Sequence, residues 1–270
     1  MATSTYIIRG GVQGYDRLKV LARVMHPTTC ALFDRIGVRP GMRCLDVGCG
    51  SGDVSFELAR RTAPTGRAVG VDLDDVKLEL ARRSAAQVGL ANVEFRCIDV
   101  HDLVGNAEFD VVYARFLLSH LRDPAALLRT LRSLLRPGGC IAVEDIDCSG
   151  ALCHPPSRAH DRYMELYTQT ARSRGADPNI GVRLPELLVS AGLSGIDVNV
   201  VQHVALTGDP KALPLLTMQT IAEAVVNEKH AAADEIEKII EDLSTLASDS
   251  TTLMGTPRVV QAWATKGARP

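Results

Sequence analysis

The 270-residue sequence lacks any continuous apolar run of eighteen residues, the length that a membrane-spanning helix requires. Its first residues, Met1 to Thr5, contain neither a basic segment nor an apolar stretch, so they do not resemble a secretory signal. The sequence therefore predicts a protein without a membrane span, and we expect it in the cytoplasm.

The sequence also lacks a cysteine pattern that is typical of disulfide bonds. The seven cysteines are odd in number and include no Cys-x-x-Cys spacing, which is typical of a reducing compartment. Cys148, Cys153 and His154 come nearest to a metal-ligand group, but no second ligand pair follows at finger spacing. The sequence therefore predicts no metal site.

The chain is poor in aromatic residues and in net charge. Aromatic side chains make up 4% of the residues, and the formal net charge is −2. Such a chain offers neither the basic surface nor the stacking platform that nucleic acids bind, so we expect no nucleic-acid partner. The apolar fraction of 46% is ample for a packed core. The sequence does not fix the oligomeric state, and a homodimer is compatible with it.

Short apolar runs alternate with amphipathic segments in the first half of the chain. Strand-like runs cover 43–47, 68–72, 93–97, 110–114 and 140–145, and helical patterns cover 53–61, 75–88 and 124–135. This alternation predicts an α/β fold with a doubly wound parallel sheet, in which ligands bind beyond the carboxyl ends of the strands.

Helical patterns dominate the two ends of the sequence. Two helices are predicted before the first strand, at 15–25 and 27–36, with Pro27 opening the second. After the fifth strand we expect helices at 158–174, 185–191, 211–226 and 230–247, and strands at 196–206 and 258–266.

The first strand run leads into a turn with glycine at every second position, Gly48, Gly50 and Gly52. Glycine permits positive φ and a close approach of ligand to backbone, and a helix pattern begins directly behind the turn. The spacing differs from the Gly-x-Gly-x-x-Gly of dinucleotide sites, because Asp53 takes the third glycine position and its carboxylate would repel a pyrophosphate. The turn therefore favours a ligand with positive charge and little phosphate.

Acidic residues stand at the ends of successive strand runs. Asp46 precedes the glycine turn, Asp72 ends the second run and Asp99 follows the third. Asp72 is placed to accept both hydroxyls of a ribose. Asp99 is placed to accept an exocyclic adenine amine, while Leu73 or Val100 covers the ring. Together with the turn, these residues predict a nucleoside site.

Five segments occur in the order typical of one enzyme family: Leu-Asp-Val-Gly-Cys-Gly-Ser-Gly (45–52), Gly-Val-Asp (70–72), Asp99, Phe-Asp-Val-Val-Tyr-Ala (109–114) and Leu-Leu-Arg-Pro-Gly-Gly (134–139). The chain resembles the class I S-adenosylmethionine-dependent methyltransferases, in their small-molecule, UbiE-like branch. The resemblance implies a seven-stranded Rossmann-like sheet with an antiparallel last strand. It also implies S-adenosyl-L-methionine as cofactor and transfer of its methyl group to oxygen, nitrogen or carbon of a small, fairly apolar acceptor.

The resemblance assigns individual residues to the cofactor. Gly48, Gly50, Ser51 and Asp46 would contact the methionine part of the cofactor. The ribose and adenine would be bound by Asp72, Leu73, Asp99 and Val100. Arg115 would reach the cofactor carboxylate or the acceptor. Tyr6 and Arg17 resemble residues of a lid that closes over the methionine end. By this resemblance, residues 1–40 form an N-terminal helical lid. The pattern of two helices between the last two predicted strands indicates a helical cap at 211–249, so we expect the core at 41–210 with 250–270.

The catalytic base is left open. Methyl transfer relies on positioning, and a base is needed only when the acceptor holds its proton at neutral pH. The candidates are His120, just after the fourth strand run, and Glu144 and Asp145, at the end of the fifth. The alternative for each is structural: a histidine packed under the next helix, or charge at a solvated strand end.

Two other functions stay open. One is an enzyme that uses the bound sulfonium electrostatically in a cyclisation or isomerisation. The other is a nicotinamide-dependent oxidoreductase, which Asp53 and the glycine spacing disfavour.

Overall fold

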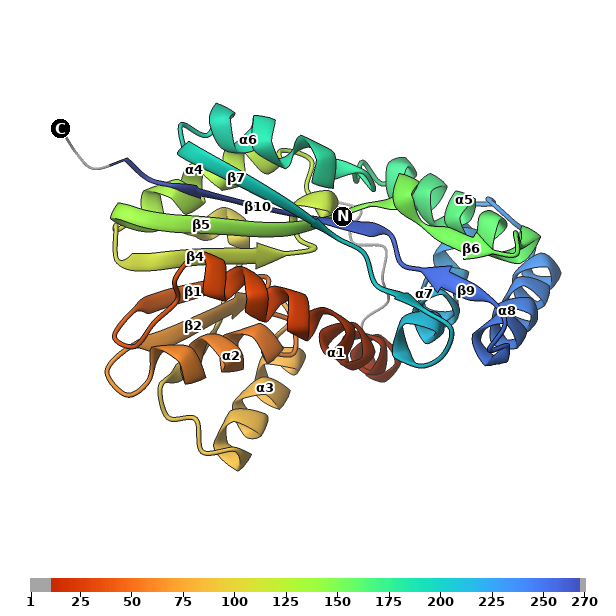
Figure 1. The fold of residues 1–270 in the computed structure, drawn as a ribbon, viewed down its shortest axis with the longest axis horizontal. Helices are drawn as coiled ribbons and strands as arrows, with labels where there is room; N and C mark the ends of the chain where they lie inside the picture. Colours follow the sequence, from red (N-terminus) through yellow and green to blue (C-terminus); the bar gives the residue numbers. More distant parts are fainter. Residues whose placement is uncertain (1–10, 268–270) are drawn as a thin grey trace.

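A computed structural model describes residues 11–267 of the chain, and their side chains from Arg17 onward. Tyr6, assigned above to the lid, lies outside the described residues. The described chain forms a main lobe around a large sheet and a second lobe of helices beside one end of that sheet (Figure 1).

The main lobe is built on a seven-stranded sheet in the order β3-β2-β1-β4-β5-β10-β7. Its strands are β1 (Arg43–Val47), β2 (Arg67–Asp72), β3 (Val93–Cys97), β4 (Phe109–Arg115), β5 (Leu135–Asp147), β7 (Ser194–Val201) and β10 (Arg258–Thr265). β10 runs antiparallel to its neighbours β5 and β7, whereas the other pairs are parallel. The predicted seven-stranded sheet with an antiparallel last strand is confirmed.

Helices cover both faces of this sheet, as the buried strands of a parallel sheet require. They are α1 (Gly11–Arg35), α2 (Asp53–Thr62), α3 (Asp75–Gln87), α4 (Pro124–Leu134) and α6 (Leu184–Ser190). Leucines of α4 and α6 pack on one face, while the end of α1 and α2 pack on the other (Figure 1). α4 begins where the sequence predicts, because the Asp123 side chain accepts a hydrogen bond from Ala126 N at 2.8 Å.

The second lobe lies beyond the carboxyl ends of the central strands (Figure 1). It contains α5 (Arg158–Ser173), α7 (Asp209–Asn227) and α8 (Ala233–Ser248), with a three-stranded sheet of β6 (Leu152–His154), β9 (Leu253–Gly255) and β8 (Val204–Ala205). Its core joins Leu166 of α5 to Met218 and Ile221 of α7 and to Ile239 and Leu243 of α8. The cap helices therefore pack as one body with α5.

Within residues 11–267 the remaining helices are four short 3-10 helices: η1 (Val100–Asp102), η2 (Leu118–His120), η3 (Cys148–Gly150) and η4 (Ile180–Arg183). In residues 11–267 we find no helix with both the length and the apolar character that crossing a membrane would require.

Three of the predicted elements are joined or divided in the structure. The helices expected at 15–25 and 27–36 form one continuous helix, α1, with Pro27 inside it. Proline removes one helical hydrogen bond, but Met25 and Leu32 are buried on either side of it, so packing keeps the helix continuous. The strand expected at 196–206 is divided into β7 and β8, because the chain leaves the main sheet after Val201 and β8 pairs with β9.

Candidate active site

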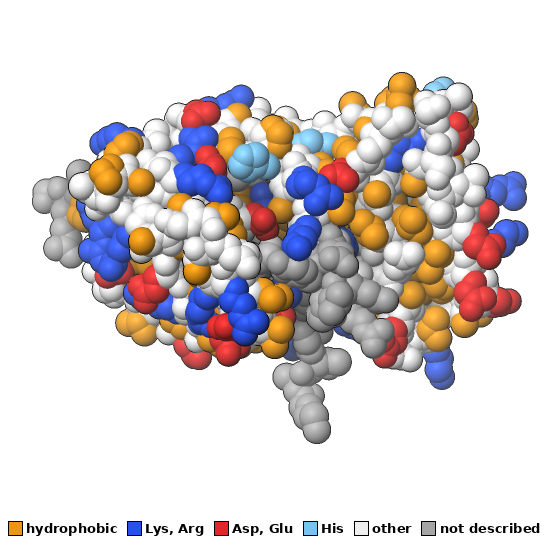
Figure 2. All heavy atoms as spheres, turned by 90° about the horizontal axis from the view of Figure 1, so that it is seen from below, with side chains coloured by type: hydrophobic (Ala, Val, Ile, Leu, Met, Phe, Trp, Pro, Cys, Tyr) orange, Lys and Arg blue, Asp and Glu red, His pale blue; other side chains and the backbone are white. Residues whose placement is uncertain are grey.

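A cavity of about 900 Å³ lies between the carboxyl ends of β1, β2 and β4 and the helices α1, α5 and α7. We call the part lined by Asp46, the glycine turn, Asp72 and Asp99 its strand end. We call the part lined by α1, η2, α5 and α7 its helix end. In Figure 2, acidic and basic side chains are intermixed over the main lobe, whereas hydrophobic ones gather on the second lobe, at the right.

The glycine turn at the strand end needs its glycines for both conformation and space. Gly48, Gly50 and Gly52 have φ of 72°, 53° and 82°, in the left-handed region that favours glycine. A Cβ on Gly48 would lie 3.2 Å from Leu117 Cδ1, and one on Gly52 would lie 2.8 Å from Phe95 Cζ. The turn thus presents bare backbone to the cavity.

Asp72 is held at the edge of the cavity by two backbone hydrogen bonds. Its Oδ2 accepts from Gly50 N at 2.8 Å, and its Oδ1 accepts from Asp74 N at 3.0 Å. Each carboxylate oxygen keeps a second lone pair for a ligand hydroxyl. The next residue, Leu73, is 67% exposed although it lines the cavity, so it offers an uncovered apolar surface beside the carboxylate.

Asp46 lies deeper, at the end of β1. It is buried, and its Oδ2 accepts a hydrogen bond from Ser55 Oγ at 2.7 Å. Burial raises the pKa of this carboxyl to about 6, although the bond from Ser55 opposes the shift. A cation placed beside Asp46 would favour its ionised form.

Two further residues fix the borders of the strand end. The Asp99 side chain accepts a hydrogen bond from His101 N at 2.9 Å and so begins η1, which brings Val100 to the cavity. The Arg115 guanidinium donates to Thr29 Oγ1 at 3.1 Å. Burial lowers the pKa of Arg115, but Tyr113 and nearby carboxylates outweigh it and raise the pKa above its ordinary value.

The structure brings eleven of the predicted site residues to this one cavity: Arg17, Asp46, Gly48, Gly50, Ser51, Asp72, Leu73, Asp99, Val100, Arg115 and His120. Glu144 and Asp145 do not line it. Both are fully buried, so their alternative reading as charge at a solvated strand end is also wrong. Glu144 is fully buried, where Oε2 accepts from Thr29 Oγ1 at 2.7 Å and from the Tyr113 hydroxyl.

Asp145 is equally buried beneath η2. Its carboxylate accepts backbone hydrogen bonds from Ser119 N at 3.1 Å and Ile146 N at 2.9 Å. Burial raises its pKa to about 6. Both carboxylates therefore have structural partners, and neither can reach a ligand in the cavity to act as its base.

His120 is the candidate base that does line the cavity. Only 8% of the residue is exposed, at the end of η2. Burial lowers the pKa of its imidazole to about 4, and the positive charge of Arg17 acts in the same direction. At neutral pH His120 is therefore a neutral imidazole.

The helix end contains residues that the sequence analysis did not name as site candidates. His160, Tyr163 and Tyr167 line the cavity from one side of α5, with ring centroids 6.3 Å and 6.4 Å apart along the series. Their spacing of three and four residues is also that of an ordinary helix core, so it carried no distinct signal. Leu213 and Thr217 of α7 complete this wall.

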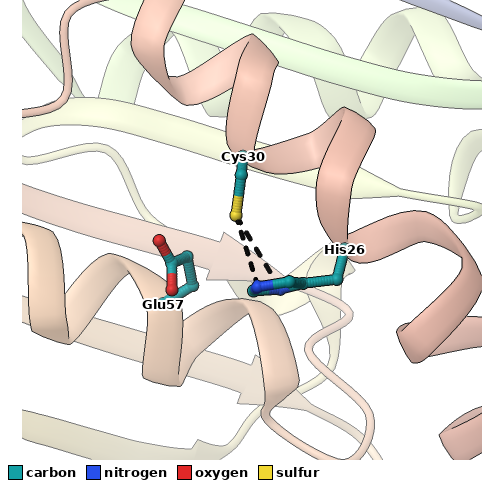
Figure 3. A group of neighbouring side chains, drawn as sticks. All are labelled: His26, Cys30 and Glu57. Carbon is teal, nitrogen blue, oxygen red and sulfur yellow. Dashed lines mark hydrogen bonds between the residues drawn. The ribbon is translucent and has the colours of Figure 1, made fainter.

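A separate group of His26, Cys30 and Glu57 joins α1 to α2 (Figure 3). Cys30 Sγ lies 3.6 Å from His26 Nε2, and one ligand atom from each of the three residues falls within 4.8 Å of the others. However, Glu57 accepts a hydrogen bond from Arg61 Nε at 2.6 Å, and this guanidinium would repel a bound cation. Among residues 17–267, Cys148 and Cys153 join no such group.

The sheet order, the glycine turn and a cavity at the strand ends define a Rossmann-like α/β protein with a nucleoside-type site. A family model described as a methyltransferase domain matches residues 39–192, more than half of the chain. The chain therefore belongs to this methyltransferase family. The resemblance to class I S-adenosylmethionine-dependent methyltransferases, inferred from the sequence motifs, is confirmed.

Individual relatives agree with this placement. The chain is 33% identical over 116 residues to a ubiquinone biosynthesis O-methyltransferase of Acinetobacter baumannii, covering 42% of this chain and 48% of that protein. It thus spans about half the length of that curated relative.

Two solved structures share the fold at low identity. One is the Haemonchus contortus phosphoethanolamine N-methyltransferase 2 in complex with phosphomonomethylethanolamine and S-adenosylhomocysteine, with a TM-score of 0.59 and 15% identity over 94% of this chain and 58% of that one. The other is the [4+2]-cyclase SpnF, with a TM-score of 0.54 and 22% identity. This match covers 90% of this chain and 82% of that one.

Proposed function

We propose that this chain binds S-adenosyl-L-methionine at the strand end of the cavity and transfers its methyl group to a small, fairly apolar acceptor at the helix end. The observation that carries the proposal is the continuity of the cavity, which joins an end rich in carboxylates to an end of largely apolar helix residues. Membership of the methyltransferase family and the named ligand of the Haemonchus relative support the choice of cofactor.

The residues present suit a cationic nucleoside. Asp46, Asp53, Asp72 and Asp99 all line the cavity, and carboxylates stabilise positive charge nearby. Asp72 would hold the ribose hydroxyls and Leu73 the adenine face.

The remaining strand-end residues would hold the other parts of the cofactor. Asp99 and Val100 would meet the adenine edge. The backbone at Gly48, Gly50 and Ser51, with Asp46, would meet the methionine part, and Arg115 its carboxylate. When bound, the cofactor would supply an electrophilic methyl group on a sulfonium.

The chain's own contribution to the transfer is positioning and exclusion of water. α1 packs across the cavity onto α7, where Arg17 Nε donates to Thr217 Oγ1 at 2.9 Å and Arg23 pairs with Asp209. This contact encloses the helix end. His120, neutral at neutral pH, is suited to accept a hydrogen bond from an acceptor hydroxyl rather than to store a proton.

The alternative of a cyclisation or isomerisation aided by the bound cofactor keeps some support, because a cyclase shares the fold. Composition favours a cytoplasmic protein with no nucleic-acid partner, and we propose both.

One assay separates the alternatives. The full chain is incubated with methyl-labelled S-adenosyl-L-methionine and small apolar acceptors that carry hydroxyl, amine or activated carbon groups. The proposal predicts labelled product and S-adenosylhomocysteine in equal amounts. Conversion of an acceptor without S-adenosylhomocysteine would instead identify a cyclase or isomerase.

A further inference from the structure

Arg17 is a buried cation at the helix end of the cavity. It lines the cavity from α1, and only 8% of the residue is exposed. Its Nε donates to Thr217 Oγ1 at 2.9 Å. The Thr217 hydroxyl donates its own proton to Leu213 O at 2.7 Å, so it meets the guanidinium as a neutral acceptor.

The charge of Arg17 has no protein counter-ion among the side chains described in residues 17–267, where its recorded partner is Thr217. A guanidinium has five N–H donors, and Thr217 engages one of them. Removing a charge from water is costly unless an anion and hydrogen bonds compensate for it. A ligand anion that enters the cavity could supply that compensation.

Arg115 provides the contrast within the same cavity. It is partly exposed. Burial lowers its pKa, but Tyr113, Glu144 and Asp46 outweigh this effect and raise the pKa above its ordinary value. The protein itself therefore balances much of the charge of Arg115 before any ligand binds. Arg17 differs because it forms no ion pair with a side chain described in residues 17–267.

The surroundings of Arg17 belong to the acceptor's side of the cavity. Its charge lowers the pKa of His120 on η2 and opposes the rise that burial causes in Tyr163 on α5. The next residue of α1, Leu18, lies 4.0 Å from a Cβ placed on Gly50. Arg17 therefore stands just past the glycine turn, where the cavity becomes apolar.

We propose that Arg17 binds a carboxylate of the methyl acceptor, so that the acceptor is a small apolar carboxylic acid. This inference rests on the proposed function. The planar guanidinium fork matches a carboxylate in shape. One buried cation balances one negative charge, whereas a phosphate ester brings nearly two. The imidazoles of His120 and His160 add no positive charge, since burial lowers the pKa of each.

The test is calorimetry on the full chain saturated with S-adenosylhomocysteine. Two ligands of nearly equal shape are compared, 4-phenylbutanoate, which carries a carboxylate, and 4-phenylbutanamide, in which an uncharged amide with an N–H donor replaces it. We expect the acid to bind about ten- to a hundredfold more tightly than the amide. Arg17→Met should bring the acid down to the affinity of the amide, whereas the lid role that the resemblance gives Arg17 would instead lower the affinity for S-adenosylhomocysteine. Arg17→Gln, which keeps hydrogen-bonding capacity without charge, should do the same if the Met variant does not fold.

The matched control is Arg23→Met, on the same helix but exposed and paired with Asp209, and it should keep the preference for the acid. Equal binding of acid and amide by the wild-type chain would overturn this inference alone. A loss of S-adenosylhomocysteine affinity in Arg17→Met would also overturn this inference. Tighter binding of 4-phenylbutyl phosphate than of the acid would overturn it as well. A wild-type chain that does not bind S-adenosylhomocysteine would overturn the proposed function as well.

Discussion

The two ends of the cavity are built in different ways. At the strand end, the aspartates accept hydrogen bonds from residues near them in the sequence: Asp99 from His101, Asp46 from Ser55, and Asp72 from Asp74. At the helix end, the bond between Arg17 and Thr217 joins residues 200 positions apart. The family model also stops at residue 192, before α7.

This difference separates the part of the site that the chain shares with its methyltransferase family from the part that is particular to this chain. Short-range contacts keep a motif recognisable wherever it occurs, so the strand end carries the family's chemistry. Long-range contacts between helix faces leave no local pattern, so the helix end is where this chain would select its acceptor. The predictions below probe the two ends separately.

The largest effect is expected at the glycine turn, from Gly52→Ala. Its φ of 82° is unfavourable for alanine, and the new Cβ would lie 2.8 Å from Phe95 Cζ and 3.1 Å from Ala81 Cβ. Backbone strain and overpacking together should lower the free energy of unfolding by about 2–5 kcal/mol. Denaturant unfolding at fixed pH measures this loss.

The control for Gly52 is Gly89→Ala. Gly89 also has positive φ, 69°, but no heavy atom lies within 4 Å of a Cβ built there. It should therefore show the backbone strain alone, about 1–2 kcal/mol. Equal losses in the two variants would show that the strand end is not packed as described.

At the helix end, His120→Gln should change how stability depends on pH. The folded pKa of about 4 lies below the ordinary value of 6.5, so between these pH values the unfolded chain binds a proton that the folded chain does not. Wild-type stability therefore falls as pH drops from 6.5 to 4, and the variant lacks this part of the fall, about 3 kcal/mol.

The measurement for His120 is the difference between the two curves of unfolding free energy against pH. Asp46 and Asp145, whose pKa burial raises to about 6, act in the opposite direction, since they favour the folded state as pH falls. They are present in both proteins and cancel in the difference. Parallel curves between pH 7 and 4 would contradict a buried, neutral His120.

The smallest effect is expected from Leu73→Ala. Leu73 is 67% exposed yet lines the strand end, so its loss should leave stability unchanged and weaken S-adenosylhomocysteine binding about three- to tenfold. Val76→Ala, equally exposed at 71% but outside the cavity, serves as the control. A drop in stability with unchanged binding would place Leu73 in the core rather than at the ligand.

The sheet was predictable because buried parallel strands are short apolar runs between helix patterns. The strand end was predictable because Asp72 and Asp99 lie where such runs end. The continuity of α1 through Pro27 could not be predicted from the sequence, because it depends on packing against other segments. The three-residue strands β6 and β9 are too short to show a period.

The catalytic candidates show the same limit. Sequence position placed Glu144 at a strand end, but its partners Thr29 and Gln261 come from α1 and β10, more than a hundred residues away. Tyr163 and Tyr167 look like core residues of an amphipathic helix until α1 and α7 are placed opposite them. Such roles follow from tertiary contacts rather than from local pattern.

The central claim is that Asp72 holds the ribose of the adenosyl cofactor at the strand end. Titration calorimetry with S-adenosylhomocysteine on the wild-type chain, Asp72→Asn and the exposed control Asp102→Asn tests it most directly. We predict one ligand per wild-type and control chain, and an affinity about ten- to a hundredfold lower in Asp72→Asn, from lost charged hydrogen bonds. No heat with the wild-type chain, or equal affinity in all three, would contradict the claim.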